Sequence, residues 1–263
     1  MVQATDLVAE KAEGDTMKLV VFGANGPTGQ LLTKQALAEG HVVTAVTRHP
    51  EAFPLRDARL RVLRGDVFDL SSVEEAVAGQ DAVLSTLGVP YSRKPITLYS
   101  QGTAHIVWAM NRYGVRRLVC VSSSGVDPHP GLGGFFFRKV LQPFFIGVVG
   151  RTLYADLKRM ETLVRNSNLD WTIVRSSGLF KTPAVTDYQA AERSINGRFT
   201  SRADLADFML KQLTDEQYLH KAVAVATRSG TPNFYMFLWK EGISKKPSSS
   251  KGVPPQGRAM IRT

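Results

Sequence analysis

Short apolar runs alternate with longer amphipathic segments between Lys18 and Leu213, and this alternation limits the possible folds more than any other feature. Such alternation is typical of strand–helix units built around a parallel sheet. Gly40 and Gly114 each follow an expected helix at the place of a left-handed cap. We therefore predict an α/β protein with strands at 19–23, 42–47, 60–63, 82–86, 118–121, 171–174 and 223–226, and helices at 28–38, 72–77, 98–113, 153–166 and 202–213.

The domain boundaries follow from composition and charge. We see no linker or internal repeat before about residue 228, so residues 17–227 are predicted to form a single domain. Residues 1–16 carry a charge of −3 and form an acidic leader, whereas residues 228–263 carry +6 of the total of +10. This basic tail is rich in Ser, Pro, Gly and Lys and should stay largely without regular structure. It is either solvated or binds an anionic surface, and we predict no specific nucleic-acid partner.

Several classes of protein are disfavoured. The first sixteen residues lack the basic start and apolar run of a signal peptide, and charged residues interrupt the apolar stretch at 132–150. We therefore expect no transmembrane helix and a cytoplasmic location. Cys120 is the lone cysteine, and the five histidines are scattered, so we expect neither an internal disulfide nor a metal site.

A glycine-rich segment, GANGPTG at residues 23–29, lies directly between an expected strand and an expected helix. A dinucleotide-binding turn needs a tight bend, a close approach of backbone N–H groups to the pyrophosphate, and close helix–sheet packing. A Cβ would obstruct these at Gly23, Gly26 and Gly29 respectively. The helix N-terminus adds partial positive charge for the phosphates. The alternative is an ordinary tight turn. The predicted cofactor-binding residues here are Gly23, Asn25, Gly26, Pro27, Thr28 and Gly29.

Further candidates follow the other strands, at the sheet edge where a dinucleotide lies. Arg48 ends the second strand, where NAD-selective proteins usually carry an acid for the ribose 2′-hydroxyl; an arginine there can pair with a 2′-phosphate, which favours NADP(H) over NAD(H). Its alternative role is a solvated cation. Asp66 either accepts a hydrogen bond from adenine or caps the following turn. The remaining cofactor-binding candidates are Val67, Thr86, Leu87, Gly88, Ser122, Lys158, Ser177 and Gly178.

These motifs resemble the atypical short-chain dehydrogenase/reductases over about residues 17–227. The shared segments are the glycine loop, GDVF at 65–68, AGQDAVLS at 78–85 and LDWTIVR at 169–175. The segment SRADLA at 201–206 is similar to the NmrA-like branch that includes flavin reductase (biliverdin-IXβ reductase). The resemblance implies a doubly wound parallel sheet (Rossmann fold), NADP(H) over the glycine loop, and a substrate held by the C-terminal third.

The candidate chemistry rests on three residues. Many short-chain dehydrogenases use a Ser with a Tyr and Lys spaced YxxxK, so that Lys lowers the pKa of Tyr, which protonates the carbonyl as hydride arrives. Here Tyr154 and Lys158 are four apart on an expected helix and share a face, and Ser123 ends a strand. This branch often lacks that tyrosine, so two alternatives stay open. Either Tyr154 is the proton donor, or hydride passes directly to a bound flavin or quinone while the protein supplies orientation and a dry pocket.

Two features concern the acceptor. Phe180 either stacks on a planar substrate or packs in the core. The insertion at 131–150 is rich in Phe and forms a substrate lid, a membrane-surface or partner contact, or a packed helical excursion. We predict an NADP(H)-dependent reductase of a small planar or apolar acceptor such as a flavin, quinone or carbonyl. The alternative is a non-catalytic NADP(H)-binding redox sensor, regulator or assembly factor.

Overall fold

The computed structural model describes residues 16–92, 94–127, 150–192, 195 and 197–232. The described helices and strands all lie in one compact unit of the chain. The predicted leader (1–16), insertion (131–150) and tail (228–263) lie outside the described residues, apart from Thr16, Gly150 and residues 228–232.

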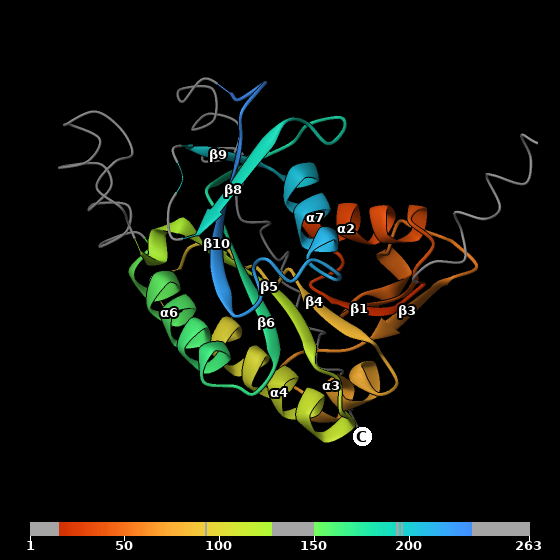
Figure 1. The fold of residues 1–263 in the computed structure, drawn as a ribbon. Coiled ribbons are helices and arrows are strands. Elements are labelled where there is room, and N and C mark those ends of the chain that lie inside the picture. Colours follow the sequence, from red (N-terminus) through yellow and green to blue (C-terminus); the bar gives the residue numbers. More distant parts are fainter. Residues whose placement is uncertain (1–15, 93, 128–149, 193–194, 196, 233–263) are drawn as a thin grey trace, which may run out of the picture. The chain divides into compact units, whose positions relative to one another are not determined.

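An eight-stranded sheet, parallel except for β8, forms the centre of this unit (Figure 1). Its order is β3-β2-β1-β4-β5-β6-β10-β8, so the chain moves outward from β1 to β3 and then outward on the other side from β4. This reversal at β1 and β4 defines a doubly wound Rossmann sheet and confirms the predicted fold class. The strands are β1 (Lys18–Phe22), β2 (Val42–Thr47), β3 (Leu60–Arg64), β4 (Ala82–Ser85), β5 (Arg117–Ser123), β6 (Asp170–Ser176), β8 (Tyr188–Glu192) and β10 (Lys221–Thr227).

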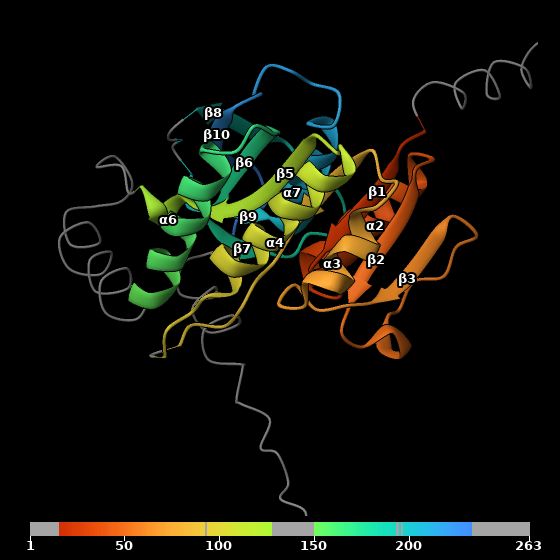
Figure 2. The same cartoon turned by 90° about the horizontal axis from the view of Figure 1, so that it is seen from below.

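Helices cover both faces of the sheet (Figures 1 and 2). One face carries α2 (Pro27–Ala38) and α7 (Arg202–Lys211), and the other carries α3 (Leu70–Val77), α4 (Leu98–Tyr113) and α6 (Arg151–Arg165). Strand side chains alternate between the two cores: in β1, Leu19 and Val21 join the core of α2 and α7, while Val20 and Phe22 join the other. Burial on both faces explains why the strands read as continuous apolar runs.

The expected strands and helices are confirmed, with ends that differ by at most two residues. Gly40 and Gly114 adopt φ values of +96° and +71°, as expected for residues that end helices. The short strands β7 (Gly178–Phe180) and β9 (Phe199–Ser201), which pair with each other, and the antiparallel β8 were not predicted. No helix in the described part of the chain has the length and apolar character needed to cross a membrane.

The first turn of α4 is capped by a carboxylate from another helix. Thr97, its N-cap residue, makes no side-chain cap hydrogen bond. Instead Asp156 of α6, which is fully buried, accepts hydrogen bonds from the backbone N–H groups of Tyr99 (2.9 Å) and Ser100 (3.3 Å). Arg159 Nη2 also donates to this carboxylate at 3.0 Å. The contact fixes α6, which carries Tyr154 and Lys158, against the start of α4.

Replacing Asp156 by Ala should lower the free energy of unfolding by about 3 kcal/mol, because buried N–H groups lose their acceptor. Asp69, which caps α3 at an exposed position and accepts from Ser71 N at 3.1 Å, is the matched control. Asp69→Ala should cost about 1 kcal/mol. Urea denaturation measures both losses, and an equal loss in the two variants would contradict a tertiary cap by Asp156.

Candidate functional site

The three glycines of the loop after β1 are required for different reasons. Gly23 has φ +76°, and a Cβ there would lie 2.7 Å from the carbonyl oxygen of Thr86. A Cβ on Gly29 would collide with the carbonyl oxygen of Gly23 and the backbone of Ala24. Gly26 differs from both, because its Cβ position has one neighbour, the Gly23 carbonyl oxygen at 3.2 Å, and its φ is −70°. The fold requires Gly23 and Gly29, whereas the space beside Gly26 is mostly open.

The start of α2 is suited to an anion. Gly26 is its N-cap residue and Pro27 occupies the first turn, so no side chain caps the helix, and no acidic residue lies in that turn. The N–H groups of a first helical turn have no partner within the helix and carry partial positive charge. Asn25 and Gln30 interact nearby, with Gln30 Nε2 donating to the Asn25 carbonyl at 3.0 Å. An uncapped helix start beside an open backbone fits the pyrophosphate of a dinucleotide.

The end of β4 closes the turn from the other side. Thr86 Oγ1 donates to the carbonyl oxygens of Phe22 (3.1 Å) and Gly23 (3.2 Å), which joins the ends of β4 and β1. Leu87 packs against the core, and nothing lies within 4 Å of the Cβ position of Gly88. The side chains of Thr86 and Leu87 therefore contact the protein itself. The predicted contact of this segment with the cofactor would be made by its backbone.

Arg48 and Asp66 follow β2 and β3 at the same edge of the sheet. The Arg48 side chain is exposed, and its guanidinium has no hydrogen bond or ion pair among the described residues. Asp66 Oδ1 accepts from Phe68 N at 3.0 Å, the turn-capping alternative considered above. Val67 is buried, and a Cβ on Gly102 of α4 would lie 2.9 Å from its Cγ2 atom. Of these side chains, Arg48 is the one free to meet a phosphate.

Tyr154 lies beside Ser123 and Tyr91. Its hydroxyl oxygen is 3.4 Å from that of Tyr91, and the Ser123 side chain acts to lower its pKa. Burial raises the pKa of Tyr154 well above its usual range, and the Tyr91 hydroxyl raises it further. Lys158 is not among the groups that shift this pKa, so its lowering by Lys158 stays a prediction. Desolvation is the largest cause of the rise.

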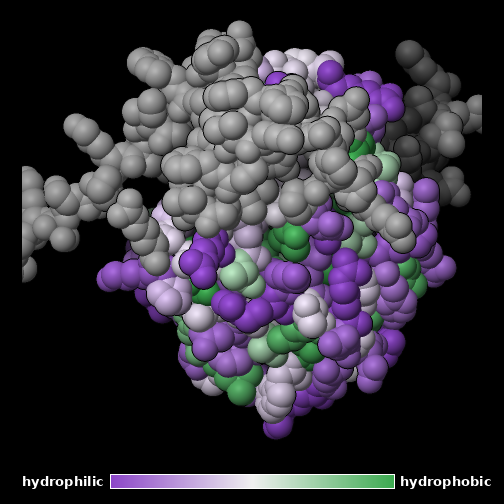
Figure 3. Space-filling view, turned by 90° about the vertical axis from the view of Figure 1, so that its left-hand side faces the viewer, coloured by the Kyte–Doolittle hydropathy of each residue, from purple (hydrophilic) through white to green (hydrophobic). Residues whose placement is uncertain are grey.

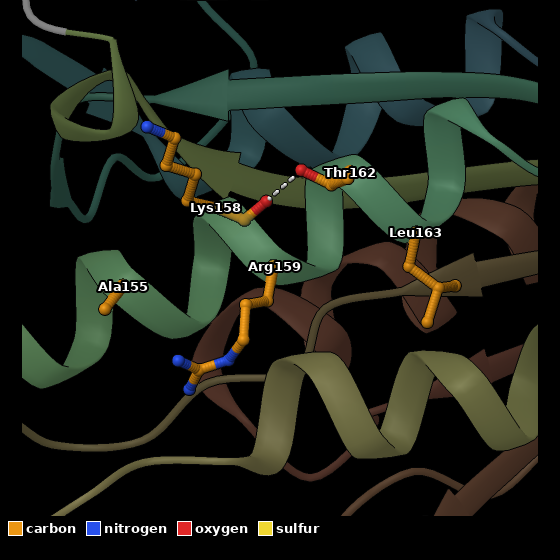
Figure 4. Close-up of a pocket in the computed structure, with 5 residues that line it drawn as sticks. All are labelled: Ala155, Lys158, Arg159, Thr162 and Leu163. Atoms are coloured by element: carbon orange, nitrogen blue, oxygen red, sulfur yellow. Dashed lines mark hydrogen bonds between the residues drawn. The ribbon is translucent and has the colours of Figure 1, made fainter.

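Lys158 of α6 is exposed. Its side chain and that of Arg159 extend from the helix in opposite directions (Figure 4). An open hollow of about 510 Å³ is lined by Ala155, Lys158, Arg159, Thr162 and Leu163. Because no residue of the glycine loop lines this hollow, we do not assign it to the pyrophosphate of the cofactor. On this side of the molecule, the coloured surface is mainly hydrophilic with smaller hydrophobic areas (Figure 3).

A buried ionic network lies beneath the serines of β5. Ser122 Oγ donates to Glu161 Oε1 at 2.8 Å, and Arg175 donates to both oxygens of Glu161, at 3.0 and 2.8 Å. Burial by itself works to lower the pKa of Arg175, but Glu161 and Asp127 raise it above its usual value. All three members of the network, Ser122, Glu161 and Arg175, are buried. The Ser122 hydroxyl is thus engaged inside the protein, and contact with a cofactor through this side chain stays a prediction.

The segment after β6 holds the remaining candidates. Ser177 Oγ lies 3.4 Å from Ser124 Oγ, and the Gly178 N–H donates to the Arg198 carbonyl at 3.1 Å. Phe180 is buried and meets Phe199 edge-on, with ring centroids 6.2 Å apart. This geometry corresponds to the packing alternative, so stacking of Phe180 on a substrate stays a prediction.

Sequence reasoning missed two residues beside Tyr154. A Cβ on Gly125 would collide with the Tyr154 ring, so this glycine admits the phenol to the end of β5. The signal was its position directly after Ser124 at the strand end. Tyr91 lies 63 residues from Tyr154 in the chain, and its contact has no local sequence signal. The described residues contain no group of three His, Cys, Asp or Glu side chains that could hold a metal ion.

The chain belongs to the NAD(P)H-binding family, whose model matches residues 23–216. It is 29% identical over 243 residues to an uncharacterized chloroplastic protein of Arabidopsis thaliana, covering 87% of this chain and 84% of that protein. It is 34% identical over 128 residues to the 2-alkyl-3-oxoalkanoate reductase of Stenotrophomonas maltophilia, covering 44% of this chain and 38% of that enzyme. Because the relative from Arabidopsis is chloroplastic, a cytoplasmic location stays a prediction.

Two solved structures share the fold. A short-chain dehydrogenase/reductase of Veillonella parvula in complex with NADP is 21% identical with a TM-score of 0.69, covering 84% of this chain and all of that one. The anaerobilin reductase ChuY of Escherichia coli O157:H7 is 22% identical with a TM-score of 0.61, covering 82% of this chain and all of that one. Reductases thus recur among the related proteins, which supports the prediction of an oxidoreductase.

Replacing Gly26 by Val should weaken NADPH binding by about 100-fold or more while leaving the protein folded, because the new side chain fills space that the pyrophosphate needs. Gly29→Val is the contrasting variant, since its side chain collides with backbone and should lower the melting temperature. Calorimetric titration and thermal denaturation separate the two effects. NADPH binding that is unchanged in Gly26→Val would contradict the assignment of this loop.

Proposed function

We propose that the protein is an NADP(H)-dependent reductase that transfers hydride to a small planar or apolar acceptor such as a flavin, a quinone or a carbonyl compound. The observation that carries the proposal is the open space beside Gly26 at the uncapped start of α2, in a loop whose other two glycines the fold itself requires. A single domain, residues 17–227, holds both cofactor and acceptor in this proposal.

Backbone groups of the glycine loop bind the pyrophosphate, and Arg48 pairs with the 2′-phosphate. Its exposed guanidinium, free of partners among the described residues, supports the preference for NADP(H). Asp66 and Val67 line the adenine side, while Gly88, Ser177 and Gly178 provide backbone near the ribose and nicotinamide. Bound NADPH supplies the hydride.

Tyr154 protonates a carbonyl acceptor, and the Ser123 side chain orients its phenol. The raised pKa keeps the Tyr154 proton in place until negative charge develops on the acceptor oxygen. Lys158 binds the ribose hydroxyls after its exposed side chain turns toward the cofactor. A flavin or quinone acceptor needs no proton from the protein in the hydride step, so Tyr154 then only helps to exclude water.

A second candidate function is a non-catalytic NADP(H)-binding redox sensor, regulator or assembly factor. The observation that favours it is the exposed position of Lys158, together with the raised pKa of Tyr154. Lys158 is not among the groups that shift the pKa of Tyr154, as it would be in the activated Tyr–Lys pair of a typical short-chain dehydrogenase. Such a protein binds NADPH but turns over no acceptor.

Arg48→Ala should weaken NADPH binding about 30-fold, because a charge-assisted hydrogen bond is worth about 2 kcal/mol, while NADH binding changes little. Arg61→Ala is the matched control, since this arginine pairs with Glu75 on the surface. Calorimetric titration with each cofactor gives the comparison. Equal losses for NADPH and NADH in Arg48→Ala would refute the 2′-phosphate assignment.

An assay of NADPH oxidation tests the proposed reductase. The absorbance of NADPH is monitored in the presence of a panel of flavins, quinones and carbonyl compounds. The wild type should turn over at least one class. With a carbonyl acceptor, Tyr154→Phe should lower kcat about 100-fold, whereas flavin or quinone reduction should be unaffected. A wild type that binds NADPH and turns over none of the panel would favour the sensor.

A further inference from the structure

Tyr91 is an exposed aromatic residue held at a fixed position beside the candidate site. It lies in the segment between β4 and α4, and its side chain is 57% exposed. Its hydroxyl oxygen lies 3.4 Å from that of Tyr154, which is partly buried against the core of α4 and α6. Tyr91 therefore meets solvent on one side and Tyr154 on the other.

The segment that carries Tyr91 is anchored on both sides of it. Before Tyr91, the backbone N–H of Val89 donates to the Tyr99 hydroxyl at 3.3 Å. After it, the carbonyl oxygen of Ser92 accepts from Thr152 Oγ1 of α6 at 2.7 Å. Because Thr152 lies two residues before Tyr154, the second bond ties the segment to the same helix turn. These anchors hold the backbone on both sides of Tyr91 close to the start of α6, which carries Tyr154.

The hydroxyl groups of Tyr154 and Tyr91 form a path that begins beside the end of β5. Their oxygens lie 3.4 Å apart, and the Ser123 side chain is among the groups that act on the Tyr154 phenol. The absence of a Cβ on Gly125 lets the Tyr154 ring enter this position. The path thus runs from the sheet edge, where the nicotinamide is proposed to lie, to the exposed phenol of Tyr91.

We propose that Tyr91 is a positioning residue that acts through Tyr154, orienting its O–H group and returning a proton to it from solvent. This inference rests on the proposed reduction of a carbonyl acceptor. Among the described residues Lys158 makes no hydrogen bond to Tyr154, whereas the Tyr91 hydroxyl lies 3.4 Å from it. Tyr91 connects the partly buried phenol to water.

The proton balance assigns one step to each residue. Hydride from NADPH forms a C–H bond at the carbonyl carbon, so the acceptor is reduced and the cofactor is oxidised to NADP⁺. The Tyr154 O–H bond breaks and its proton goes to the acceptor oxygen. The Tyr91 proton then passes to the Tyr154 oxygen, and Tyr91 takes a proton from water or a buffer acid. Each turnover consumes one solvent proton.

The kinetic test uses Tyr91→Phe, with Tyr113→Phe as the matched control. Tyr113, at the end of α4, is an exposed tyrosine whose hydroxyl donates a hydrogen bond to Glu74 of α3. Tyr91→Phe should lower kcat for the carbonyl acceptor about tenfold with KM unchanged, and Tyr113→Phe should have no effect. In the Tyr154→Phe background, Tyr91→Phe should cause no further loss, because both changes break one path.

Other kinetic outcomes overturn the inference. If Tyr91→Phe has the kcat and KM of the wild type while Tyr91→Leu has a raised KM, the ring of Tyr91 contacts the acceptor and its hydroxyl transfers no proton to Tyr154. Losses that multiply in the double variant would mean that the two hydroxyls act separately. A wild type that turns over no acceptor refutes the proposed function and this inference together, whereas normal turnover by Tyr91→Phe refutes the inference alone.

A measurement without cofactor tests the contact itself. In protein labelled with ¹³C at tyrosine Cζ, the Tyr154 signal is assigned by its loss in Tyr154→Phe. Removing the Tyr91 hydroxyl should shift that signal at neutral pH, since the phenol loses a hydrogen-bond partner. Tyr113→Phe should leave it in place. An unshifted Tyr154 signal in Tyr91→Phe would overturn the inference.

Discussion

The packing of Gly23 against the backbone at the end of β4 is the constraint on which the site depends. Gly23 takes a left-handed φ of +76°, and its missing Cβ lets the Thr86 carbonyl approach within the space that a side chain would fill. Thr86 strengthens this contact with two hydrogen bonds to the end of β1. Because β1 and β4 are the strands at which the winding of the sheet reverses, the turn at Gly23 shapes the crevice where Rossmann proteins bind their cofactors.

A second constraint holds the other half of the site. Glu161 of α6 and Arg175 of β6 form a buried, doubly hydrogen-bonded ion pair that also binds Ser122 of β5. Removing one member would leave a buried charge without its partner, which is costly in a low-dielectric interior. Together with the Asp156 cap on α4, this network sets where α6 lies against the sheet. The position of Tyr154 therefore depends on contacts far from its own hydroxyl.

Local patterns predicted the fold well. Strands buried on both faces, amphipathic helices and glycine caps depend on neighbouring residues, so β1 to β6 and their helices could be assigned from the sequence. The short strands β7 and β9 and the half-exposed β8 lack such patterns, because they form only by pairing with distant segments. In the site, the roles of Gly23 and Gly29 follow from the motif. The raised pKa of Tyr154 and its contact with Tyr91 arise from long-range packing that no spacing reveals.

Amide hydrogen–deuterium exchange with and without saturating NADPH tests the central claim, that the cofactor binds over the glycine loop at the carboxyl edge of the sheet. The account predicts slower exchange at residues 23–29 and 86–88 when NADPH is bound. Slower exchange confined to the α6 face around Lys158 and Leu163, with the glycine loop unaffected, would contradict it.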